Sequence, residues 1–153
     1  MRHFLLTVPV LLLSTVGLLA QEHKAIQSPD QLKWQPGPPG LPQGAEFVVL
    51  SGDPAASSGY FAVRLKVPAG YKVPPHNHPT TEQVTVLSGD FGIGMGDKFD
   101  ESKGQEFKPG GFANMPAKMN HFAWSKNGAV FQLQGQSPLD ITYVAPADAP
   151  RNQ

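Results

Sequence analysis

The stretch 70–89, bracketed by glycines, limits what this chain can fold into more than any other. It contains His76, His78 and Glu82 in the spacing His-x-His-x3-Glu. Side chains that are two residues apart on a strand point to the same face, so both imidazoles would lie on one side. Residues 79–81, Pro-Thr-Thr, allow a tight turn, after which the carboxylate would meet the imidazoles across a hairpin. The stretch therefore predicts two short strands that present ligands to a metal ion.

The ligand types narrow the choice of ion. Imidazole suits zinc, copper, iron and nickel, whereas a carboxylate shifts the preference towards harder ions such as manganese and iron. Two histidines and one carboxylate are also the ligands of oxygen-activating iron sites. We therefore expect one divalent transition metal: iron, manganese, nickel, copper or zinc. Glu82 has a second potential role, because a carboxylate beside a metal can act as a catalytic base instead of a ligand.

The spacing Gly-x5-His-x-His-x3-Glu-x6-Gly resembles the first motif of the cupin superfamily at every named position. This resemblance implies an all-β fold, a small antiparallel barrel of the jelly-roll type with the metal inside. The chain after residue 45 supports short strands, because residues 60–67 alternate between apolar and polar side chains.

A second stretch resembles the other cupin motif at Gly110, Pro116 and His121. It departs from that motif at two positions, since Lys118 stands where the family usually has Gly and Ser125 where it usually has Asn. The resemblance implies that this motif contributes one more imidazole. The implied metal ligands are His76, His78, Glu82 and His121.

Composition excludes several other classes. Sixteen glycines and sixteen prolines in 153 residues disfavour a helical protein and favour short strands joined by turns. The absence of cysteine rules out disulfides, thiolate ligands and a cysteine nucleophile. The net charge is zero and no basic run is present, so we expect no nucleic-acid partner.

Residues 1–20 resemble a secretory signal peptide. Arg2 and His3 precede an apolar run, residues 4–20, that ends in the small residue Ala20. We expect cleavage near this point and a periplasmic or secreted protein. The alternative is an uncleaved membrane anchor through residues 4–20, although about 17 apolar residues are short for a span.

The remainder divides into three parts. Residues 21–44 form a Pro-rich arm, which we expect to be extended and to pack, from Trp34 onward, on its own domain or on a partner subunit. Residues 45–145 form the single cupin domain, within which the charged stretch 97–108 is expected to be a surface loop. Residues 146–153 form a short tail.

The same alternation predicts a pocket next to the ligands. Val84 and Val86 are in phase with Glu82, and Ala123 is in phase with His121. Other apolar residues are expected to complete the walls: Phe91, Ile93, Met95, Met115, Phe131 and Leu133. Such a cavity, apolar with few polar groups, suits a small aromatic or other hydrophobic organic molecule.

Glycines at positions 92, 94 and 96 would leave one face of a strand open to close approach by another strand or by the arm. Together with the family resemblance and the arm around Trp34, this face predicts a homo-oligomer, namely a dimer.

Three functions fit these features. The first is a metal-dependent dioxygenase that acts on a small aromatic or other organic molecule. The second is a non-catalytic metal-binding or ligand-binding sensor, similar to the zinc-holding cupin domains of anti-sigma factors. The third is a metal-assisted isomerase or decarboxylase.

Overall fold

The computed structural model describes residues 27–150. The predicted signal peptide, residues 1–20, lies outside these residues, as do residues 21–26 of the arm and residues 151–153 of the tail. Within residues 27–150, no helix has the length and apolar character needed to span a membrane.

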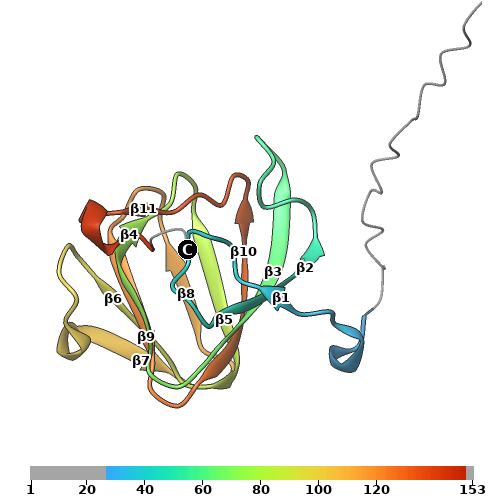
Figure 1. The fold of residues 1–153 in the computed structure, drawn as a ribbon, viewed down its shortest axis with the longest axis horizontal. Helices are drawn as coiled ribbons and strands as arrows, with labels where there is room; N and C mark the ends of the chain where they lie inside the picture. Colours follow the sequence, from blue (N-terminus) through green and yellow to red (C-terminus); the bar gives the residue numbers. More distant parts are fainter. Residues whose placement is uncertain (1–26, 151–153) are drawn as a thin grey trace, which may run out of the picture.

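Two antiparallel sheets face each other across a common interior (Figure 1). The six-stranded sheet has the order β1 (Gln35–Pro36), β2 (Glu46–Ser51), β3 (Tyr60–Val67), β10 (Ala129–Gln136), β5 (Glu82–Gly89) and β8 (Phe112–Met115). The five-stranded sheet has the order β11 (Thr142–Tyr143), β4 (Tyr71–Asn77), β9 (His121–Ser125), β6 (Phe91–Met95) and β7 (Gly104–Phe107). Three 3-10 turns complete the described elements: Pro29–Gln31, Glu101–Lys103 and Pro146–Asp148.

The prediction of an all-β antiparallel jelly roll is confirmed, but the two sheets do not close into the predicted barrel. In the part of the chain that the structure describes, the strands form two separate sheets. The outermost strands are short: β1 and β11 have two residues each, and β7 and β8 have four each. Such short edges present few backbone groups for pairing, so the two sheets pack face to face without a continuous ladder.

Strand periodicity places the core between the sheets. Along β3 the alternate residues Phe61, Val63, Leu65 and Val67 are buried, while the residues between them are half-buried. Strand β10 pairs with β3 on one side and with β5 on the other, and it contributes buried residues to the same interior. Each strand therefore directs one face inward, as its period of two requires.

The charged stretch 97–108 is only partly a loop, which corrects the prediction. Its last part forms β7, an edge strand that pairs with β6 from Phe91 opposite Phe107 to Gly94 opposite Gly104. Its middle residues, Gln105 and Glu106, are exposed. A short polar edge strand carries no apolar alternation, so its sequence is indistinguishable from that of a solvated loop.

The glycines of β6 serve packing within the chain. A Cβ atom on Gly92 would lie 2.1 Å from the indole of Trp124, and one on Gly94 would lie 2.2 Å from the ring of Phe122. These two aromatic side chains of β9 fill the space over Gly92 and Gly94 in which another strand or the arm was expected. Trp34 is also engaged within the chain, because the Lys66 ammonium lies 5.4 Å from the centre of its ring. The homo-dimer stays a prediction from the family resemblance.

Asp90, between β5 and β6, stabilises the turn that follows β9. Its carboxylate accepts hydrogen bonds from the backbone N–H of Lys126 at 2.8 Å and from the side-chain amide of Asn127 at 2.7 Å. The Asn127 bond, opposed in part by burial, lowers the pKa of Asp90 below its usual value, and the backbone N–H of Lys126 adds to the effect. The carboxylate therefore joins two segments that are far apart in the sequence.

We expect Asp90→Ala to lower the free energy of unfolding by about 2 to 3 kcal/mol at pH 7, because two hydrogen bonds to a charged group are lost. A lowered native pKa stabilises the fold above the unfolded pKa of about 3.9, and this contribution disappears as the pH falls through the native pKa. The difference between wild type and variant, measured by urea unfolding, should thus narrow from pH 7 to pH 3. Asp148→Ala, at an exposed position, is the control. A difference that stays constant with pH would contradict this role.

Candidate metal centre

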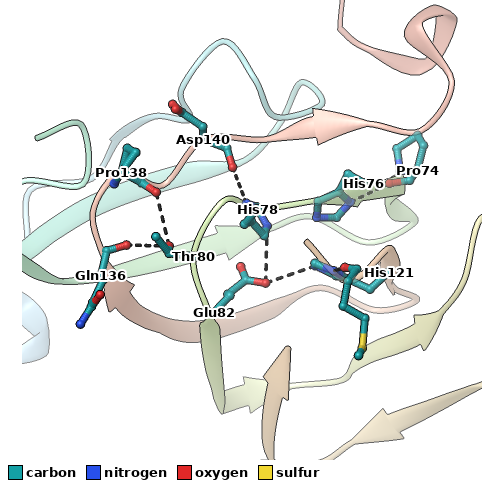
Figure 2. A network of polar contacts seen from close by, with 10 residues as sticks. Pro74, His76, His78, Thr80, Glu82, His121, Gln136, Pro138 and Asp140 are labelled. Carbon is teal, nitrogen blue, oxygen red and sulfur yellow. Dashed lines mark hydrogen bonds and ion pairs between the residues drawn. The ribbon is translucent and has the colours of Figure 1, made fainter. Parts of the chain in front are cut away.

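The four predicted ligands come together at one end of the interior (Figure 2). His76 is the penultimate residue of β4, and His78 follows that strand directly. Glu82 begins β5 in the opposite sheet, and His121 begins β9, where it pairs with His76. All four side chains are buried. The end of β4 and the starts of β5 and β9 meet here, and this brings residues from both sheets to a common point.

The separations between these side chains suit a single ion. The ligand atoms of His76, His78 and His121 all lie within 4.8 Å of one another. Glu82 Oε2 lies 3.2 Å from Nε2 of His121 and 3.5 Å from Nε2 of His78. Two atoms that are each about 2.1 Å from one ion are roughly 3.0 to 3.4 Å apart, depending on the coordination geometry. The carboxylate is therefore placed as a neighbour of two imidazoles around a shared centre.

Each of the three imidazoles is oriented by a backbone carbonyl. The acceptors for Nδ1 of His76, His78 and His121 are, in turn, the carbonyl oxygens of Pro74 at 2.7 Å, Asp140 at 2.6 Å and Met119 at 3.0 Å. Since a carbonyl oxygen can only accept, Nδ1 must carry the proton in each ring. The lone pair of a neutral ring is then on Nε2, as in metal sites whose histidines donate their second N–H to a carbonyl.

One buried nitrogen of the cluster lacks a partner that a metal ion could provide. Nε2 of His78 is buried and makes no hydrogen bond in residues 27–150. A buried polar nitrogen without a partner is costly, and the Glu82 oxygen at 3.5 Å does not satisfy it. A cation between His78, His121 and Glu82 would remove this cost, so the residues present fit a metal ion.

The pKa shifts within the cluster favour protonation states that can bind a cation. Burial, aided by the neighbouring imidazoles of His121 and His78, lowers the pKa of His76 to about 3. Burial alone would raise the pKa of Glu82, but its hydrogen bond with His121 and the nearby imidazoles outweigh it and lower that pKa. Burial alone would lower the pKa of His121, but the hydrogen bond and the charge of the Glu82 carboxylate outweigh it and raise that pKa. The site therefore holds an ionised carboxylate beside a neutral His76.

The turn before His121 contains Lys118 in a conformation that glycine adopts more readily. Lys118 has φ of 61°, the left-handed conformation for which the family uses Gly. Its backbone N–H donates to the carbonyl of His78 at 2.8 Å. This backbone bond links the turn to the first histidine pair.

A cavity of about 680 Å³ opens beside the cluster. Among the predicted wall residues, the cavity is lined by Val84, Met115, Ala123 and Phe131, together with Phe91, Ile93 and Leu133. Two predicted wall residues are not part of it. Val86 is buried in the core beyond the cavity, further along β5 from Glu82. Met95 is the last residue of β6 and is 45% exposed, because the strand ends there.

Sequence patterns missed a second part of the lining. Pro38, Gly40 and Leu41 of the arm reach the cavity, and so do residues 139–142 near the C-terminus. The phase of the strands gave no signal for these segments, since they lie outside the long strands. The Pro-Gly composition of the arm only indicated an extended chain.

Two facing antiparallel sheets with a histidine cluster at one end of the interior define a cupin. Residues 22–132 match the family model of the ChrR cupin-like domain, which is most of the chain. The protein therefore belongs to the ChrR cupin-like family, and the resemblance seen in the two sequence motifs is confirmed. A comparison with curated protein sequences finds no match.

Solved structures agree on the fold. The polyketide cyclase RemF from Streptomyces resistomycificus is similar with a TM-score of 0.67 and 18% identity, over 83% of this chain and 89% of that one. A proposed acetylacetone dioxygenase from Methylibium petroleiphilum PM1 is similar with a TM-score of 0.61 and 20% identity, over 88% of this chain and 91% of that one. The DMSP lyase DddQ from Ruegeria pomeroyi DSS-3 is similar with a TM-score of 0.57 and 19% identity, over 73% of this chain and 60% of that one. At these identities the similarity concerns the fold alone.

We expect His78→Ala to weaken the binding of Zn²⁺ or Co²⁺ by more than roughly 100-fold. Loss of a residue that only hydrogen-bonds to a ligand already lowers metal affinity by about 10- to 100-fold, and loss of a ligand should cost more. Isothermal titration against each ion measures the effect. Asp140→Asn is the matched control, since Asp140 orients His78 through its backbone carbonyl and the substitution leaves that carbonyl in place. Equal affinities for wild type and His78→Ala would contradict the assignment.

Proposed function

We propose that this protein is a metal-dependent oxidoreductase of the dioxygenase type, acting on a small and mainly apolar aromatic molecule. One observation carries the proposal: three imidazoles, each bonded through Nδ1 to a backbone carbonyl, converge beside an ionised carboxylate and face an apolar cavity. The fold is compatible with this reaction class, since a proposed acetylacetone dioxygenase has a similar fold over most of both chains.

The chain's own residues divide the work. His76, His78 and His121 would hold the ion, and the apolar walls would bind and orient the substrate and exclude water. Glu82 Oε2 would accept the proton of a substrate hydroxyl, because its lowered pKa keeps it ionised at neutral pH. A bound redox-active ion would supply Lewis-acid and electron-transfer chemistry. In the overall reaction both atoms of one O₂ enter the product as a carbon–carbon bond breaks, so no external reductant is needed.

The alternative is a non-catalytic metal-binding sensor. The observation in its favour is the position of Glu82, which lies at ligand distance from two of the imidazoles. Zinc held by three histidines and this carboxylate would have no open position, as in structural sites. Metal analysis of the protein isolated from its own cells separates the two functions. Iron, manganese, nickel or copper would support chemistry, whereas zinc alone would support the sensor.

We also propose that the protein is exported. The support is the sequence of residues 1–20, a charged start followed by an apolar run that ends at Ala20. N-terminal sequencing of protein from the cell envelope should then find a start near Gln21. An intact Met1 in a membrane fraction would support the anchor instead.

Loaded with iron, manganese or nickel, the protein should consume oxygen with a catechol or a flavonol. We expect Glu82→Ala to abolish this turnover while weakening metal binding less than His76→Ala does, because the three imidazoles remain. Oxygen-electrode rates and metal titrations of the two variants make the comparison. Gln83→Ala, which alters the neighbouring half-buried side chain, is the control. If oxygen uptake stays at background with all three metals, the proposed oxidoreductase function is wrong and the metal-binding sensor is favoured instead.

A further inference from the structure

One wall of the cavity belongs to neither of the two facing sheets. It consists of Pro38, Gly40 and Leu41, which we call the arm wall. These residues lie between β1 and β2, in the segment that crosses from the six-stranded sheet towards the five-stranded one (Figure 1). Leu41 is half-buried and packs against the core cluster. The arm wall therefore completes the cavity from outside the strand framework.

Two buried tyrosines hold this segment in place. The Tyr143 hydroxyl donates to the carbonyl of Gly40 at 2.9 Å, and the Tyr71 hydroxyl donates to the carbonyl of Pro42 at 2.9 Å. Both tyrosines belong to the five-stranded sheet, in β11 and β4. The arm is thus anchored on that sheet by specific hydrogen bonds, in addition to its pairing with β2 on the other sheet.

The anchoring also brings the arm wall close to the metal ligands. The ring of Tyr143 lies 5.9 Å from the ring of His76, between centres. Gly40 packs so closely on Ile141 that a Cβ atom there would lie 2.6 Å from the Ile141 side chain. The next residue before Ile141, Asp140, orients His78 through its carbonyl. The same short segment therefore contacts the arm on one side and the metal ligands on the other.

The cavity offers a bound molecule little else for discrimination. Among the described residues that line it, no lysine or arginine is present, and the polar side chains besides the four candidate ligands are Asp140 and Thr142, both exposed. A molecule whose polar group lies at the histidines would have only apolar walls around its other end. Selection among such molecules must then depend on shape and size.

We propose that the arm wall determines the specificity of the site, with Leu41 setting the size of the apolar molecule that fits and Tyr143 positioning the wall. This inference rests on the proposed function only in taking the cavity as the ligand site. Truncation of Leu41 enlarges the cavity and favours larger molecules, whereas a larger side chain reduces it.

The test compares two neutral apolar probes on the Co²⁺-loaded full chain. N-phenyl-1-naphthylamine is followed by its fluorescence, and naphthalene by displacement of that probe. Leu41→Ala should shift the ratio of the two dissociation constants by roughly three- to tenfold in favour of the larger probe, since several methyl-sized contacts are lost. Leu41→Phe should shift the ratio in the opposite direction. Tyr143→Phe should shift it as Leu41→Ala does, because the wall loses its anchor at Gly40.

Leu32→Ala is the matched control, because Leu32 is a buried leucine of the same arm that does not line the cavity. Its ratio should equal that of the wild type, and the visible spectrum of Co²⁺ should be unchanged in every Leu variant. The inference is overturned if the ratio of dissociation constants is unchanged in both Leu41 variants, or if it changes equally in Leu32→Ala. Neither result would bear on the assignment of the metal ligands. Failure of the wild type to bind either probe overturns the cavity as a ligand site, and the inference with it.

Discussion

Three hydrogen bonds between imidazole N–H groups and backbone carbonyls are the interactions on which the site depends. They set the ring orientation and the tautomer of each histidine before any ligand binds, so little ordering is left for the binding step. Two of the acceptors lie only two residues from their histidines, in Pro74 and Met119. The third, Asp140, lies 62 residues from His78. The site is therefore complete only when the segment after β10 has packed beside β4.

This dependence on distant packing explains which parts could be predicted from sequence. The strand period and the turn after His78 were sufficient to group His76, His78 and Glu82, and the family resemblance added His121. Neither indicates where a strand ends, and so Met95 was expected in the cavity although it lies at an exposed strand end. The arm and the Asp140 carbonyl were also missed, because main-chain acceptors and irregular segments leave no periodic signal in the sequence.

The interior separates two kinds of surface. The candidate ligands occupy one end, whereas β3, β5 and β10 line the remaining space with apolar side chains. Desolvation favours this separation, because a buried carboxylate and three imidazoles lose less when they satisfy one another than when they are dispersed among apolar residues. A molecule that enters is consequently oriented, since its polar group is stable only near the histidines.

Lys118 shows how local strain is tolerated where it connects ligand segments. A side chain in the left-handed conformation costs roughly 1 to 2 kcal/mol, and Gly would avoid this cost. The conformation nevertheless allows the Lys118 N–H to reach the carbonyl of His78 at 2.8 Å, across the turn that leads into His121. That bond joins the second motif to the first at the point where their imidazoles must converge. The backbone geometry of the turn, rather than the identity of its side chain, makes this connection between the two motifs.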